Sequence, residues 1–148
     1  MLEEAGFPAL APMLDARLSR ANPLTGDKTE QAFYTSNWSE RHAAYAAGLG
    51  TFGLSKGLIT GKGVAGRCLS IISSLPLEAD KRHLGIYDNC SNCGACIRNC
   101  PAAAISKERG KNHYLCSEFI ESVRAKCAPR FGCGKCQVDV PCEAGAPA

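Results

Sequence analysis

The sequence lacks a stretch that could enter or cross a membrane. No run approaches the ~20 apolar residues of a transmembrane helix. Residues 1–11 are acidic and include Pro8, and they lack both the basic start and the apolar run of a secretory signal peptide. We therefore expect a protein of the reducing cytoplasm, without contact with a membrane.

Recognisable catalytic residues are also scarce. Nothing resembles a Ser-His-Asp or Cys-His arrangement or a pair of carboxylates, and the scattered histidines receive no role: His42, His83 and His113. The formal net charge is only +3, and no stripe of basic residues predicts a nucleic-acid surface. Hydrolytic chemistry and nucleic-acid binding therefore find no support in these features.

Cysteine, in contrast, is abundant, with ten residues in a chain of 148. Cys90, Cys93, Cys96 and Cys100 form the pattern Cys-x2-Cys-x2-Cys-x3-Cys-Pro, which is the bacterial ferredoxin motif. Two intervening residues let a tight turn direct successive sulfurs toward one cubane of iron and sulfide, and the small Gly94 keeps that turn compact. The pattern therefore predicts an iron-sulfur site.

The fourth cysteine of this motif predicts a second cluster. In two-cluster ferredoxins this residue ligates the other cluster, and four further cysteines follow in the sequence: Cys116, Cys133, Cys136 and Cys142. We therefore predict two [4Fe-4S] clusters held by eight thiolates. Zinc is the main alternative, because Cys-x2-Cys pairs also bind zinc, but a four-ligand zinc site leaves the longer pattern unexplained. Disulfides are the least favoured alternative.

Two cysteines remain outside these sets. Cys68 begins a predicted strand and is most simply a small buried apolar residue. Cys127 lies eleven residues after Cys116 and would share its helical face, so it could replace Cys116 as a ligand. We prefer Cys116, because Ala128 and Pro129 predict that the helix ends near Cys127.

The remaining sequence predicts an α+β chain. A helix or helical turns are expected at 1–21, interrupted by Pro8 and Pro12. Helices are also expected at 38–47, capped by Ser36 or Ser39 and ended by Gly48, and at 116–126. The segment 22–37 is expected to be a loop, and 68–75 a strand. A boundary near residues 80–87 separates a front region, 1–85, from a cluster lobe, 86–148.

Two glycine patterns, in 48–53 and 61–66, match G-x-G-x-x-G by spacing alone. A dinucleotide-binding fingerprint follows a strand and opens a helix. The first pattern follows a predicted helix, and the second leads into a predicted strand. We interpret both as glycine-rich turns that let the backbone approach a ligand or cofactor closely.

The order of these features resembles the C-terminal part of epoxyqueuosine reductases, which are related to reductive dehalogenases. The resemblance covers roughly residues 34–142 and consists of Glu40-Arg41, Ala-Gly-Leu-Gly at 47–50, a turn at Gly53, a strand, the cysteine motif, the lone Cys116 and Phe-Gly-Cys-x2-Cys at 131–136. It implies a partial nitroreductase-like α/β front region that holds cobalamin, followed by a helical and loop-rich ferredoxin-type lobe.

The resemblance also implies a distribution of ligands. It assigns one cluster to Cys90, Cys93, Cys96 and Cys142, and the other to Cys100, Cys116, Cys133 and Cys136. Three features depart from the family: two extra residues precede Cys142, Tyr34 stands where the family has its catalytic acid, and the chain begins well inside the first domain of the family. A complete cobalamin pocket is therefore not expected.

These observations lead to an iron-sulfur electron-transfer protein as the first hypothesis. Its expected partner is a ferredoxin- or flavodoxin-type redox protein or a cofactor-bearing reductase. A cobalamin-dependent reductase acting on tRNA or on a small molecule is the alternative, and only this alternative involves tRNA. A zinc-binding interaction module is the third hypothesis.

Overall fold

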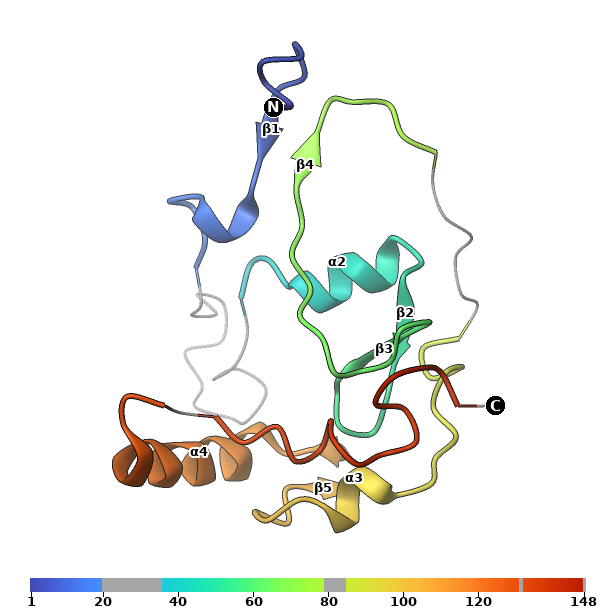
Figure 1. The fold of residues 1–148 in the computed structure, drawn as a ribbon, viewed down its shortest axis with the longest axis vertical. Helices are drawn as coiled ribbons and strands as arrows, with labels where there is room; N and C mark the ends of the chain where they lie inside the picture. The colour runs from blue at the N-terminus through green and yellow to red at the C-terminus, as the bar shows by residue number, and fades with distance from the viewer. Residues whose placement is uncertain (20–35, 79–84, 131, 148) are drawn as a thin grey trace. The chain divides into compact units, whose positions relative to one another are not determined.

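The computed structural model describes residues 1–19, 36–78, 85–130 and 132–147 of the chain (Figure 1). The fold is mixed α+β, with short helices and two-stranded antiparallel sheets. Contacts divide it into a front unit, Met1–Leu49 with Arg67–Arg82, and a cysteine unit, Gly50–Gly66 with His83–Ala148. Each unit is discontinuous in sequence, because residues 50–66 belong to the cysteine unit. The predicted division into domains at residue 85 stays a prediction. None of the described helices is long and apolar enough to cross a membrane.

The front unit has little regular structure among its described residues. Its elements are β1 (Ala9–Leu10), the 3-10 helix η1 (Pro12–Leu14), α2 (Glu40–Ala46) and β4 (Ile72–Ser73), and β1 pairs with β4. The predicted helix at 38–47 is confirmed as α2. Ser39 caps it by accepting a hydrogen bond from the backbone N–H of His42 at 3.5 Å.

Two predictions for this unit are wrong in extent. Residues 1–19 form turns, β1 and the 3-10 helix η1, so only the expected helical turns are found in part and no longer helix forms. Pro8 and Pro12 lack the N–H groups that a helix needs and restrict the residues before them. The strand predicted at 68–75 contains only β4, which is as far as its pairing with β1 extends. Cys68 is half-buried. The predicted loop at 22–37 lies almost entirely outside the described residues.

The cysteine unit alternates short hairpins with helices. Its elements are β2 (Gly50–Phe52) and β3 (Leu58–Thr60), α3 (Ala95–Arg98), β5 (Ile105–Ser106) and β6 (Gly110–Lys111), and α4 (His113–Cys127). The predicted helix at 116–126 is confirmed but begins three residues earlier. Asn112 caps it, because its side-chain oxygen accepts a hydrogen bond from the N–H of Leu115 at 2.9 Å.

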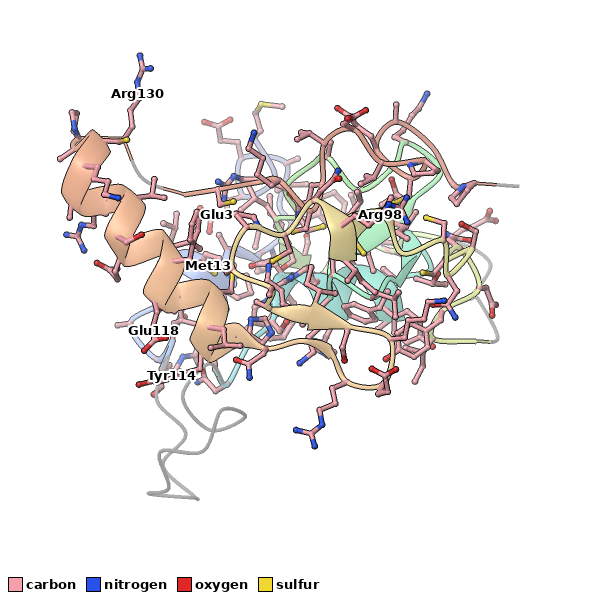
Figure 2. All side chains as sticks on the ribbon, turned by 90° about the horizontal axis from the view of Figure 1, so that it is seen from below. Glu3, Met13, Arg98, Tyr114, Glu118 and Arg130 are labelled. Atoms are coloured by element: carbon pink, nitrogen blue, oxygen red, sulfur yellow. The ribbon has the colours of Figure 1, made fainter. Side chains whose placement is uncertain are left out.

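Helix α4 is amphipathic without being deeply buried. Its predicted apolar stripe is half-buried and consists of Cys116, Phe119, Ile120 and Val123. Tyr114 and Glu118, which lie one turn apart, are exposed (Figure 2). The stripe therefore gives Cys116 a partly shielded position rather than a buried one.

A small core of the cysteine unit lies beside the cysteines. It contains four buried apolar residues from separate segments: Ile59, Val64, Ala95 and Val140. Three half-buried cysteines pack against it: Cys90, Cys96 and Cys142. Ile59 is only 2% exposed. The hairpin β2–β3 therefore builds part of the environment of the cysteines, although it precedes them by some thirty residues.

The glycine-rich turns do allow the backbone to approach a neighbour closely. The neighbour in each case described below is another segment of the chain's own backbone. A Cβ on Gly50 would collide with the carbonyl oxygen of Ile59 in the paired strand, and a Cβ on Gly63 would collide with that of Glu143. Gly63 also has φ +86°, which disfavours other residues. Among the described residues, no helix follows either glycine pattern directly, as a dinucleotide fingerprint would require.

Gly63 provides a test of this close packing. We expect Gly63→Ala to lower the free energy of unfolding by roughly 2 kcal/mol or more, because it adds both backbone strain and a collision. Gly61→Ala is the matched control in the same turn, since no atom lies within 4 Å of the added Cβ. Denaturant midpoints of the anaerobic proteins, followed by circular dichroism, measure both. Equal midpoints would contradict the described contact with Glu143.

Candidate functional site

Two cavities of the cysteine unit are each lined by four of the predicted ligand residues. The first site contains Cys90, Cys93, Cys96 and Cys142. The second site contains Cys100, Cys116, Cys133 and Cys136. The structure therefore brings the eight cysteines together in two sets of four.

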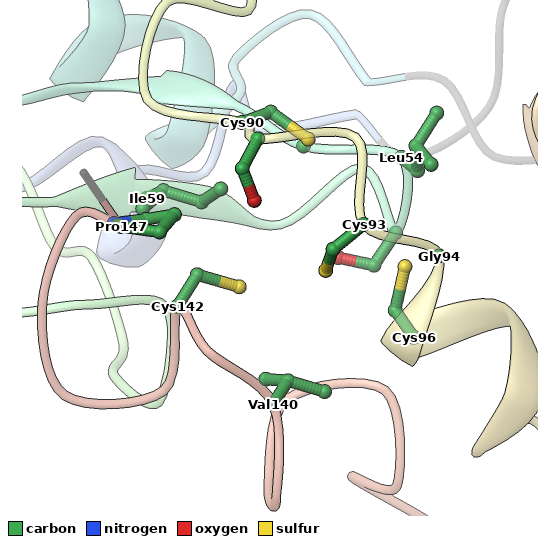
Figure 3. Close-up of a pocket in the computed structure, with 12 residues that line it drawn as sticks. Leu54, Ile59, Cys90, Cys93, Gly94, Cys96, Val140, Cys142 and Pro147 are labelled. Carbon is green, nitrogen blue, oxygen red and sulfur yellow. The ribbon is translucent and has the colours of Figure 1, made fainter.

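The first site is assembled from three segments. Cys90 ends a loop, Cys93 and Cys96 flank the start of α3, and Cys142 comes from the C-terminal segment. The four sulfurs surround a common space (Figure 3). Gly94 precedes α3 with φ 72°, a left-handed conformation that turns the chain sharply between two of the cysteines. Ile59 and Val140 supply apolar walls.

Hydrogen bonds from the hairpin region fix two of these cysteines. The backbone N–H of Asn89 donates to Thr51 Oγ1 at 2.8 Å, and its side-chain amide donates to the carbonyl of Ile59 at 2.8 Å. These bonds hold the chain immediately before Cys90. The N–H of Val64 donates to the carbonyl oxygen of Cys142 at 2.8 Å. The hairpin and the following turn thus position both ends of the first site.

The second site is built around the two helices and the loop that follows α4. Cys100 lies just after α3, Cys116 lies in the first half of α4, and Cys133 and Cys136 come from the loop. The N–H of Ala104 donates to Cys100 Sγ at 3.3 Å. This bond ties the Cys100 sulfur to the backbone just before β5.

A lysine provides a second bond to sulfur at this site. Lys111 Nζ donates to Cys136 Sγ at 3.9 Å, and Lys111 also lines the cavity. Asn99 bridges to the loop that carries Cys136, because its amide donates to the carbonyls of Val138 at 3.3 Å and Asp139 at 3.1 Å. The end of α3 is thereby tied to the C-terminal segment.

The thiols of each site interact electrostatically. Burial raises the pKa of Cys96, and the neighbouring Cys90 and Cys142 thiols raise it further. Burial is also the main cause of the raised pKa values of Cys136 and Cys142. Several thiolates cannot share a low-dielectric space without repulsion, so a cationic group among them would stabilise all of them together.

Cys93 behaves differently from the other members of its set. A hydrogen bond from the backbone of Ala95 lowers the pKa of the Cys93 thiol, and the charge of Arg98 contributes in the same direction. The side chain of Cys93 is also exposed. This thiol is therefore more easily ionised than those of Cys96 and Cys142, whose pKa values are raised.

The sulfur donors of each cavity suit a polynuclear group. Each cavity is lined by four cysteines, and cysteine thiolates are the ligands that hold iron-sulfur clusters. In the described ranges of the chain, no three Cys, His, Asp or Glu side chains are grouped as ligands of a single ion. Ligands of an iron-sulfur cubane stand farther apart, because each binds a different iron. The residues present therefore fit such a group.

Among the described residues, neither Cys127 nor Cys68 lines one of these cavities. Cys127 is the exposed last residue of α4 and lines neither cavity, whereas Cys116 does. Cys68 belongs to the front unit. Tyr34 and His83 lie outside the described residues.

The sequence reading missed Thr51, Asn89 and Asn99. Asn89 and Asn99 directly precede Cys90 and Cys100, and this adjacency is the one signal that could have found them. Thr51 is fully buried in β2 and carries no signal of its own.

Comparison with known proteins identifies one part of the chain. Residues 85–106 match the 4Fe-4S binding domain family, Fer4. This segment includes Cys90, Cys93, Cys96 and Cys100. No curated protein and no solved structure matches the chain. The match supports a 4Fe-4S site and leaves the number of clusters to be measured.

Thr51 provides a test of how the first site is held. Thr51→Val removes the acceptor of the Asn89 N–H bond at nearly constant volume, and we expect it to cost about 1–3 kcal/mol of unfolding free energy. It should also speed the bleaching of the protein by an iron chelator. Thr51→Ser retains the hydroxyl and should stay closer to the unsubstituted protein in both measurements. A serine variant as weakened as the valine variant would contradict a role for this hydrogen bond.

Proposed function

We propose that this chain, which matches a 4Fe-4S binding domain over residues 85–106, is an electron-transfer protein that holds two [4Fe-4S] clusters. The observation that carries the proposal is the division of eight cysteines into two sets of four around separate cavities. When bound, such clusters supply reversible one-electron transfer. The chain holds them, shields them from water and adjusts their reduction potentials.

The proposed ligands of the first cluster are Cys90, Cys93, Cys96 and Cys142, and those of the second are Cys100, Cys116, Cys133 and Cys136. The crossing of Cys100 to the second cavity supports this assignment, because it is the arrangement of two-cluster ferredoxins. The longer spacing before Cys142 is accommodated by a turn at Asp139, whose N–H donates to Glu143 Oε2 at 2.7 Å. The extra residues therefore do not prevent Cys142 from reaching the first cavity.

The surroundings of the two sites support a role in electron transfer. Apolar residues, among them Ile59, Val140 and Ile105, line the cavities and restrict water near the sulfurs. Hydrogen bonds to sulfur and nearby charge are the means by which a protein sets the potential of a cluster. The proposed partner is a ferredoxin- or flavodoxin-type redox protein, or a reductase that carries its own cofactor.

A cobalamin-dependent reductase related to the epoxyqueuosine reductases is the second candidate. The crossed distribution of the cysteines favours it, because the resemblance implies the same distribution. Its substrate would be tRNA or a small molecule. Tyr34, at the position of the family's catalytic acid, lies outside the described residues. The electron-transfer proposal does not depend on this relationship.

We expect anaerobically purified protein to contain about eight irons and eight acid-labile sulfides. Its broad visible absorption should be bleached by dithionite. Iron, sulfide, zinc and cobalamin are measured on the same sample, so that one assay separates the three hypotheses. Stoichiometric zinc without sulfide would overturn the proposal and favour the zinc module, whereas bound cobalamin would favour the reductase.

The ligand assignment predicts which variants damage the same cluster. Cys142→Ala should remove the same electron paramagnetic resonance signal of the reduced protein as Cys93→Ala, because both residues line the first cavity. Cys100→Ala and Cys116→Ala should remove the other signal. Cys127→Ala is the control and should keep both signals, because Cys127 lines neither cavity.

Iron counts accompany each spectrum. If Cys142→Ala removed the signal that Cys133→Ala also removes, the sites would be sequential along the chain rather than crossed. The assignment of Cys142 to the first cluster would then be wrong.

A further inference from the structure

The two sites differ in the charge that faces their sulfurs. In the second site, two lysines line the cavity, and one of them, Lys111, bonds Cys136 Sγ through its ammonium at 3.9 Å. Among the described residues, no lysine or arginine lines the first cavity. The exposed Arg98 donates at 3.2 Å to the carbonyl oxygen of Cys93 rather than to its sulfur.

We propose that Lys111 raises the reduction potential of the second site above that of the first, so that an electron entering the protein rests at the second site. This inference depends on the two-cluster assignment proposed above. Beyond that assignment, the inference states which site has the higher reduction potential and which residue causes the difference. Lys111 acts here as a positioning residue through Cys136, and not as a ligand.

The physical reason is the charge that reduction adds. A cluster gains one electron and no proton in this step, so the reduced form carries one more negative charge than the oxidised form. An ammonium near one of the ligand sulfurs attracts that added charge, and the attraction falls with distance. Lys111 is half-buried, so water screens its charge less than it screens the exposed Arg98.

The backbone holds the Lys111 side chain near this sulfur. Lys111 belongs to β6 and pairs with Ile105 of β5, which is only 4% exposed. The next residue, Asn112, donates its N–H to the carbonyl of the buried Ala104 at 2.6 Å. In the described part of the chain, no carboxylate lies within ion-pair distance of Lys111. Its charge is therefore available to the sulfur.

The order of potentials also orders the transfer. With both clusters bound, a one-electron donor protein would be oxidised as either site is reduced, and an electron on the first site would pass to the second. The electron then leaves to a one-electron acceptor. No bond is made or broken in these steps, and the second site is the favoured point of exit.

The test is a redox titration at fixed pH, followed by electron paramagnetic resonance, on anaerobic protein with its clusters bound. Lys111→Met should shift the higher-potential couple to a more negative value by about 59 mV, which corresponds to a tenfold change in the one-electron equilibrium. The lower-potential couple should move much less. Lys111→Arg should restore the potential, because it restores the charge.

Lys107→Met is the matched control, because Lys107 is an exposed residue in the turn of the same hairpin and does not line the cavity. It should shift neither couple by a comparable amount. Lys111→Gln separates the effect of charge from that of hydrogen bonding, since the glutamine amide is neutral but can still donate to sulfur. If Lys111→Met loses iron, Lys111→Gln serves as the neutral variant in its place. The glutamine variant should shift the potential as the methionine variant does.

The couple that shifts must be the one whose signal is lost in Cys116→Ala. An unchanged higher-potential couple in the neutral variants, or a shift confined to the other couple, would overturn the proposal. A failure of the two-cluster assignment can be told apart from a failure of the Lys111 proposal. The first would appear in the iron and sulfide counts, before any potential is measured.

Discussion

Repulsion among thiolates is the constraint on which the described arrangement of the cysteine unit depends. Burial raises the pKa of the Cys96 thiol, and the charges of the neighbouring Cys90 and Cys142 raise it further. The chain holds them together through backbone bonds such as that from Val64 to Cys142. A cationic iron-sulfide core would turn this repulsion into attraction.

Helix α3 connects the two sites in spite of its short length. Cys96 lies within it and lines the first cavity, whereas Cys100 follows it and lines the second. Asn99, between these two cysteines, binds the turn that leads to Cys142. The two sites therefore share one rigid segment, and a change in α3 would disturb both of them.

The sequence predicted the parts of the structure that depend on local chemistry. The spacing of Cys90, Cys93 and Cys96 is set by a tight turn, and the end of α4 at Cys127 is set by Pro129. Short strands were not predictable, because strands of two or three residues exist only through their partners. The bond between Thr51 and Asn89 joins residues 38 positions apart, and no local pattern encodes it.

The buried apolar core of the described residues is small. Among the described residues, eight apolar side chains are buried, and three of these are alanines: Ala44, Ala95 and Ala104. A core of this size supplies little hydrophobic stabilisation. In small domains of this kind the free energy of metal binding becomes free energy of folding. The cysteines that pack against Ile59 and Val140 are thus part of the core as well as part of the proposed sites, and cluster binding and packing stabilise the same contacts.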